Sequence, residues 1–99
     1  MYLRVTRGRC DPGKADELYA MGSRVEAGVK AQPGCHDCRA GIDRQAGTTL
    51  VVSTFDTLEH AKFPRENLGE EYLQTLAKLG WQGDPPEFYE MHPGWDERS

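Results

Sequence analysis

The segment CHDC, at residues 35–38, places two cysteines, a histidine and an aspartate close together. A CxxC pair can contribute to a zinc site, which takes about four ligands, or it can carry out thiol–disulfide exchange. Ligands for a zinc site are scarce, because the only other cysteine is Cys10. A redox pair normally has its reactive thiol at the N-terminus of a helix, whereas the residues that follow here, RAGID, are typical of a strand.

The geometry of a strand argues against both kinds of site. Successive strand side chains point to opposite faces, so Cys35 and Cys38 are expected to point away from each other. Cys10, at the end of the first strand, is expected at the opposite end of the sheet from Cys35. We therefore predict no metal site and thiols that contribute to packing.

A second set of candidates lies between residues 60 and 67. His60 could act as a general base or a ligand, because an imidazole titrates near neutral pH. Arg65 and Asn67 could orient a phenolate or a carbonyl group. The alternative is a solvated helix surface, since helical spacing places His60 about 200° from Leu58, opposite the apolar side formed by Leu58 and Ala61.

Polar and aromatic residues at the two ends of the chain form a third set. Tyr2, Arg4 and Thr6 alternate along the first strand and therefore share one face, where they could supply polar groups to a cavity between sheet and helices. A dimer interface is the alternative role for these three residues. Trp81 is expected to close the core beneath the second helix or to line the mouth of a pocket.

The pattern of apolar residues predicts the elements that position these side chains. Alternating strands, capped helices and the glycine-containing turn RQAG indicate the order strand, helix, strand, strand, broken helix, strand. The expected ranges are 2–10, 12–31, 35–43, 48–55, 56–79 and 87–91. A capping box of Asp56 and Glu59 should begin the second helix, and Pro64 should interrupt it. This is the split βαβ pattern (βαββαβ) of a ferredoxin-like α+β fold with an antiparallel sheet.

The third strand predicts a second copy of the chain as a partner. Leu50, Val51 and Val52 are consecutive, which indicates that both faces of this strand are covered. Helices can cover one face, and the sheet of a second subunit can cover the other. We expect residues 1–99 to form one domain with a core at 2–91, and the tail at 92–99 to pack its Trp95 on the partner.

Charge and composition limit the other partners. With 12 basic and 16 acidic residues the chain carries a net charge of -4, which gives no general attraction to nucleic acid or anionic membranes. We expect no leader peptide and no membrane span. Three cysteines cannot all pair within one chain, so reduced thiols and a cytoplasmic location are expected. Phosphate-binding loops, dinucleotide motifs and nucleophile elbows are not recognisable in the sequence.

Three segments resemble the antibiotic biosynthesis monooxygenase family of the dimeric α+β barrel superfamily. They are CDPGKADEL at 10–18, QPGC at 32–35 and LVVSTFDTLEHAKF at 50–63, and the resemblance extends over residues 2–91. It implies a homodimer that acts without a cofactor or metal as a monooxygenase of a small phenolic, quinol or polycyclic aromatic compound. His60 would then be the base, and Arg65 or Asn67 would stabilise oxyanion charge.

The resemblance also indicates substrate-binding residues and two alternatives. Tyr2, Arg4, Thr6, Phe55 and Trp81 are the candidates for substrate binding, although many relatives carry tryptophan at the position of Phe55. Haem-degrading relatives use an asparagine in the first strand, a tryptophan and a helical histidine, of which only the histidine has a counterpart here. A haem-binding or haem-degrading protein and a non-catalytic dimeric ligand-binding module therefore remain alternatives to the oxygenase.

Overall fold

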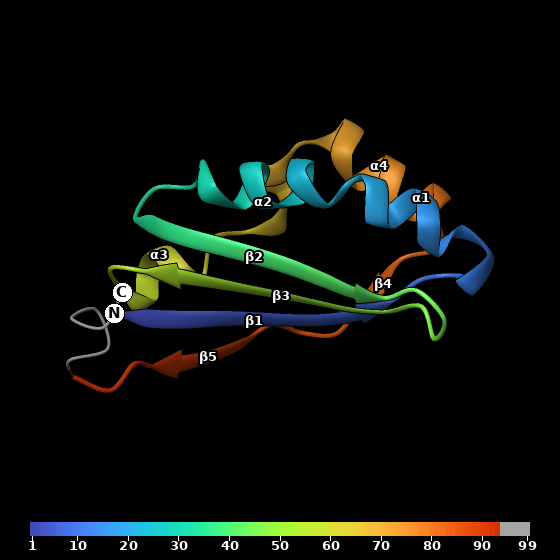
Figure 1. Ribbon diagram of the computed structural model, residues 1–99. Helices are drawn as coiled ribbons and strands as arrows, with labels where there is room; N and C mark the ends of the chain where they lie inside the picture. Colours follow the sequence, from blue (N-terminus) through green and yellow to red (C-terminus); the bar gives the residue numbers. More distant parts are fainter. Residues whose placement is uncertain (94–99) are drawn as a thin grey trace.

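A computed structural model describes residues 1–93 of the chain (Figure 1). The strands are β1 (Tyr2–Arg9), β2 (Cys35–Asp43), β3 (Thr48–Phe55), β4 (Gln82–Gly83) and β5 (Glu87–Glu90). The helices are α1 (Ala15–Ala20), α2 (Gly22–Lys30), α3 (Leu58–Ala61) and α4 (Glu70–Lys78), with short 3-10 helices η1 (Pro12–Lys14) and η2 (Arg65–Leu68). Within residues 1–93, none of the helices is long and apolar enough to cross a membrane.

The strands form one antiparallel sheet in the order β2-β3-β1, with β4 and β5 both pairing with the other edge of β1. This arrangement confirms the predicted ferredoxin-like α+β fold. The last strand is divided, because the prolines at 85 and 86 have no N–H group to donate to the ladder. The short strand β4 lies between the predicted ranges 56–79 and 87–91, where no strand was expected.

The register of the strands assigns their side chains to two faces of the sheet. Paired residues of antiparallel neighbours lie on the same face, which groups Arg4 with Ser53 and Cys38. We call this side the helix face, because α1, α2 and α4 all lie over it in Figure 1. The other side is called the open face. Its apolar residues are Leu3, Val5, Leu50, Val52 and Tyr89.

The first helical region, predicted as one helix, consists of α1 and α2, which meet at Met21. Gly22 follows the break and has a poor intrinsic helix propensity. The spacing of the apolar residues continues across Met21, so it did not reveal the break. Leu18, Val25 and Val29 recur at helical spacing across the break, and all three are buried.

The start of the second helical region also differs from the prediction. Thr57, rather than Asp56, caps α3, and its Oγ1 accepts the backbone N–H of His60 at 3.1 Å. Helix α3 has only 4 residues. As predicted, Pro64 separates it from the helical segments that follow.

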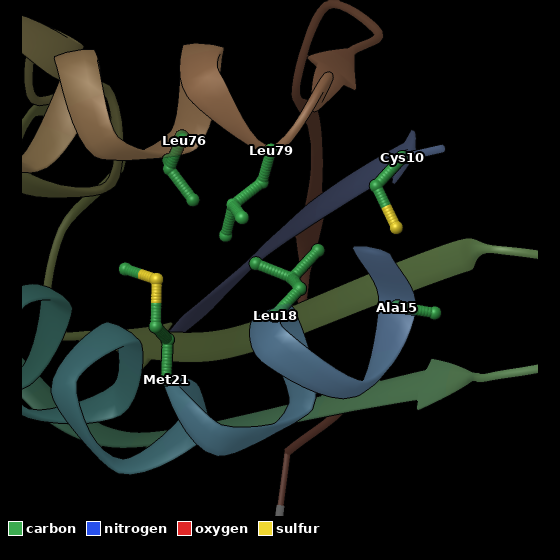
Figure 2. Close-up of a cluster of buried hydrophobic side chains, with 6 residues drawn as sticks. All are labelled: Cys10, Ala15, Leu18, Met21, Leu76 and Leu79. Carbon is green, nitrogen blue, oxygen red and sulfur yellow. The ribbon is translucent and has the colours of Figure 1, made fainter. Parts of the chain in front are cut away.

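Buried side chains form two separate clusters beneath the helices. In the first, Leu76 of α4 and Leu79, directly after this helix, point toward Leu18 and Met21, as Figure 2 shows. Cys10 and Ala15 complete the cluster. The second contains Val29, Cys38, Phe55, Ala61 and Phe63. A core of this kind usually forms one contiguous cluster, so the division requires an explanation.

A β-bulge overturns the predicted orientation of the cysteines. The register shifts between Cys35 and Asp37, so Cys35 pairs with Phe55 while Cys38 pairs with Ser53. Because Phe55 and Ser53 are two residues apart, both cysteines lie on the helix face, and the prediction that they point apart was wrong.

Candidate functional site

A cavity of about 410 Å³ lies between the helix face and the covering helices. Its walls are mainly apolar and include residues from both buried clusters, which explains why the core is divided. Residues that contribute to these walls are Leu18, Val29, Val51, Phe63, Leu68 and Leu76. Protein interiors are normally close-packed, so a space of this size in a 99-residue chain is a natural candidate for a ligand site.

The space exists partly because the apolar stripe of α1 and α2 contains a glycine. Gly22 lies at helical spacing between Leu18 and Val25, both of which are buried, and all three residues line the cavity. A Cβ atom at Gly22 would meet no other atom within 4 Å. A side chain at this position would therefore project into the cavity.

Trp81 forms one end of the cavity. A Cβ atom at Gly8 or Gly83 would clash with the indole ring, so the ring lies closely against the backbone of β1 and β4. The Nε1–H group of Trp81 donates to Oγ1 of Thr49 at 3.0 Å. The guanidinium carbon of Arg65 lies 5.8 Å from the centre of the indole ring. Both of these predicted site residues, Trp81 and Arg65, line the cavity.

Arg4 lies nearer the other end, four residues along β1 from Gly8, which corresponds to about 13 Å in an extended strand. Its Nη1 atom donates to the carbonyl oxygens of Ala61 and Phe63 at 2.8 and 2.9 Å. The guanidinium carbon lies 3.9 Å from the centre of the Phe63 ring, within the range of a cation–π interaction. Burial lowers the pKa of the Arg4 guanidinium from its usual value.

Apart from the carboxylate of Asp84, the remaining polar groups of the cavity are mainly hydroxyls. Thr6, which was predicted, and Ser53 contribute from the sheet, and Tyr72 contributes from α4. Burial raises the pKa of the Tyr72 phenol to about 12, so at neutral pH it is a hydrogen-bond donor and not a base. The sequence analysis missed Ser53 and Tyr72 as site residues. The signal for Tyr72 was its position at helical spacing between Leu68 and Leu76, which places a phenol hydroxyl on an apolar helix face.

Four of the eight predicted site residues do not line the cavity. Phe55 is fully buried, with its ring centre 5.8 Å from that of Phe63. Tyr2 packs against the same cluster from the helix face. Tyr2, Arg4 and Thr6 share one face of the sheet, as predicted, and this is the helix face.

His60 and Asn67 lie on the surface. Nδ1 of His60 is 2.7 Å from Oδ1 of Asp56, and the side chain of His60 is 45% exposed. Since a carboxylate only accepts, Nδ1–H donates, and this hydrogen bond lowers the pKa of the Asp56 carboxyl. Nδ2 of Asn67 donates to the side chain of Gln32 at 3.3 Å.

Gly34 allows the pair of His60 and Asp56 to lie directly against the backbone. Its φ angle is 76°, in the left-handed region that favours glycine, and a Cβ atom here would overlap both side chains. The pair is therefore held in place by the turn before β2. In the neutral imidazole, donation of Nδ1–H to Asp56 leaves Nε2 as the acceptor nitrogen.

The cysteines lack the properties of reactive or metal-binding thiols. Burial raises the pKa of Cys38 to about 12, and it is also the largest cause of the raised pKa of Cys35. Both thiols are therefore protonated at neutral pH. Among the residues that the structure describes, no group of three or more histidine, cysteine and acidic side chains is arranged to hold a metal ion.

Comparisons with known proteins identify similar solved structures. No family model and no curated protein matches the sequence. A proposed antibiotic biosynthesis monooxygenase of Deinococcus radiodurans has a TM-score of 0.68 at 18% identity, and the match covers 93% of each chain. HapK of Hahella chejuensis has a TM-score of 0.73 at 14% identity, with 94% of each chain covered. SnoaB of Streptomyces nogalater, a cofactor-independent oxygenase, has a TM-score of 0.57 at 14% identity, with 92% of each chain covered.

These similarities extend over nearly the whole chain. The protein therefore has the α+β fold of structures that are named antibiotic biosynthesis monooxygenases. At identities of 12 to 21% the comparisons concern the fold, and the function has to be inferred from the cavity.

Proposed function

We propose that the chain belongs to the antibiotic biosynthesis monooxygenase family and oxidises a small phenolic, quinol or polycyclic aromatic compound without a cofactor. The observation that carries this proposal is the cavity of about 410 Å³ on the helix face. Ligand sites for small molecules have volumes of about 300–1,000 Å³ and combine apolar walls with a few polar groups. Apolar side chains and Trp81 suit aromatic rings, while Thr6, Ser53 and Tyr72 can orient their oxygen atoms.

The chemistry of such an oxygenase makes modest demands on the protein. A deprotonated phenol or quinol transfers electrons to dioxygen, and the two combine to form a peroxide. When a ring CH₂ group becomes C=O, the substrate loses four electrons. One oxygen atom enters the product, and the other leaves as water with the two hydrogens. The protein needs to exclude bulk water, accept a proton and stabilise negative charge.

His60 is the proposed base for the deprotonation. The contact with Asp56 orients the ring and leaves Nε2 able to accept a proton. Because the ring does not line the cavity, the proton would have to reach Nε2 through solvent or after a movement of α3. Arg65 is the better placed of the two proposed oxyanion-stabilising residues, since it lines the cavity and Asn67 does not.

Oxygen uptake by metal-stripped protein tests the proposed reaction. With 1,4-dihydroxynaphthalene or an anthrone we expect uptake that saturates with substrate and exceeds the uncatalysed rate. A positioned base contributes about 10²- to 10⁴-fold, so His60→Ala should lower turnover at least about 100-fold. His36→Ala is the matched control, since His36 is an exposed histidine in the adjacent bulge. Full activity of His60→Ala would reject the base but not the reaction.

Two other results would favour the alternative functions. Saturable binding of these compounds without oxygen uptake would indicate a ligand-binding module. A Soret shift with hemin that is lost in His60→Ala would indicate a haem protein. The position of His60 argues against the haem alternative, because a haem in the cavity would not contact this histidine in the present arrangement.

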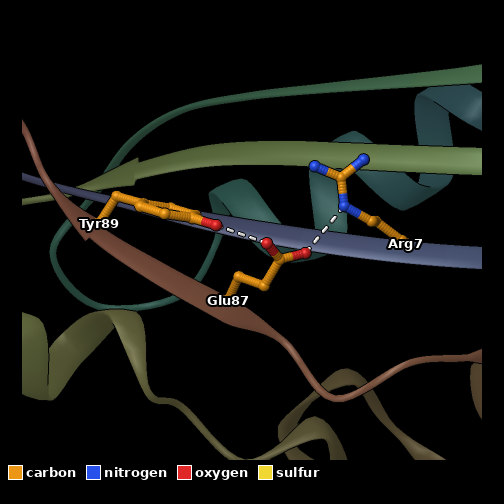
Figure 3. A network of polar contacts seen from close by, with 3 residues as sticks. All are labelled: Arg7, Glu87 and Tyr89. Carbon is orange, nitrogen blue, oxygen red and sulfur yellow. Dashed lines mark hydrogen bonds and ion pairs between the residues drawn. The ribbon is translucent and has the colours of Figure 1, made fainter.

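The proposed partner is a second copy of the chain, bound through the open face. Leu50 is 39% exposed and Tyr89 is 49% exposed on this face. Figure 3 shows Tyr89 and Arg7 both bonded to Glu87, and in the sheet Arg7 pairs with Leu50 and Glu87 pairs with Val5. Subunit interfaces combine apolar residues with polar groups of this kind. The predicted contact of Trp95 lies outside the described residues.

A cytoplasmic location is also proposed. All three cysteines are free, and Cys10 and Cys38 are buried. Free thiols are usual in the reducing environment of the cytoplasm.

A further inference from the structure

The guanidinium of Arg4 is a half-buried positive charge without a carboxylate partner among residues 1–93. Its two hydrogen bonds go to the carbonyl oxygens of Ala61 and Phe63, which carry no net charge. Both bonds are made by Nη1, and a guanidinium has five N–H donors. The N–H groups of Nε and Nη2 therefore have no protein acceptor in the described part of the chain.

Other charges at the cavity do not neutralise Arg4. The acidic residue in its lining is Asp84, which lies near Trp81 and forms an exposed ion pair with Arg9 at 3.7 Å. Arg65 adds a second positive charge to the lining. The cavity is thus locally positive, although the chain as a whole has a net charge of -4.

The guanidinium is half-buried and its free N–H groups still reach solvent, since no fully buried side-chain nitrogen in the described residues lacks a partner. A ligand that brings the opposite charge gains more here than at an open surface, because a partly buried pair is screened less by water and salt. The lowered pKa of Arg4 has burial as its cause, without a contribution from any acidic side chain. This agrees with the geometry, in which aromatic rings and neutral carbonyl groups surround the guanidinium.

We infer that the cavity selects aromatic ligands that bind as anions, with a phenolate or carboxylate oxygen at Arg4 and the rings extending toward Trp81. The inference rests on the proposed function, in that it assigns the charge state of the ligand in the same cavity. Arg4 is then the residue that determines this specificity. A phenolate held here would be in the electron-rich form that reacts with dioxygen.

Calorimetric titration under nitrogen with 2-naphthoate and 2-naphthamide at neutral pH tests the inference. The two probes have the same rings and differ in charge. A hydrogen bond between charged groups adds enough energy for a preference of about 10- to 100-fold for the anion. We expect this preference in the wild type and its loss in Arg4→Met, with the affinity for 2-naphthamide unchanged. That unchanged affinity also shows that the cavity has kept its shape.

Two further variants keep the test decisive. Arg4→Gln retains hydrogen-bond donors and removes the charge, so it should lose the preference even if Arg4→Met does not fold. Arg39→Met is the matched control, because the side chain of Arg39 is 77% exposed and does not line the cavity, so the preference should remain. Equal affinity of the wild type for both probes, or a preference that survives in Arg4→Gln, would overturn the inference, as would binding of neither probe.

The titration separates this inference from the proposed reaction, since no oxygen is present. A preference for the anion that depends on Arg4, in a protein that shows no oxygen uptake, would support the inference and reject the oxygenase. Oxygen uptake together with equal binding of the two probes would support the oxygenase and reject the inference.

Discussion

Substitution of Gly22 by leucine is expected to abolish binding of aromatic ligands and the proposed oxygen uptake while the protein remains folded. The new side chain would enter the cavity, where a Cβ atom meets nothing within 4 Å, and would occupy the space of the ligand. Leucine also has a higher helix propensity than glycine, by somewhat less than about 1 kcal/mol, so the stability of α2 should not fall. We expect the affinity for 2-naphthoate to fall at least about 100-fold, equivalent to about 2.7 kcal/mol.

Two controls identify the cause of this loss. Ser23→Leu adds the same side chain at the next position of α2, which is exposed, and should leave the affinity unchanged. Gly22→Ala adds only a methyl group and should retain most of the binding. Calorimetry measures the affinities, and thermal unfolding confirms the fold. Undiminished binding by Gly22→Leu would show that the ligand binds elsewhere.

Replacement of Leu50 by glutamate should prevent formation of the proposed homodimer. Leu50 is partly exposed on the open face, so a charge is tolerated in the single subunit but would be buried without a counter-ion between two sheets. Burial of an unpaired charge costs several kcal/mol, so the dissociation constant should rise by more than about 100-fold. Sedimentation velocity at micromolar concentration measures the change.

The matched control for this experiment is Leu58→Glu. Leu58 is 36% exposed on α3 and is not part of the sheet, so its replacement should leave the dimer intact. A wild-type protein that sediments as a monomer at micromolar concentration would reject the proposed dimer. An equal loss of the dimer in both variants would show that the open face is not the interface.

Features that depend on local pattern were predictable from the sequence. The ranges of β2 and β3 agree with the prediction, because alternating residues and the turn RQAG define both strands. The hairpin turn is formed by contacts between near neighbours, in which Oδ1 of Asp43 accepts the N–H groups of Gln45 and Ala46. The shared face of Arg4 and Thr6 also follows from alternation along one strand.

Features that depend on contacts between distant segments were not predictable. The bulge near Cys35 arises from pairing with β3, so alternation along β2 alone gave the wrong face. The position of the cavity depends on the distance between the helices and the sheet, which the sequence does not give. For this reason, the roles of Gly22 and Tyr72 as lining residues were not predicted. The surface position of His60 follows from the four-residue helix α3 and its contact with Asp56, in agreement with the helical spacing.

The position of a bound ligand tests the central claim most directly. A crystal structure of the protein soaked with 1,4-dihydroxynaphthalene under nitrogen would show where the molecule lies. We predict electron density for the rings between the helix face and α2 and α4, with one oxygen within hydrogen-bonding distance of Arg4. Density beside His60 at the surface, between the open faces of two subunits, or at no defined position would contradict a ligand site in this cavity.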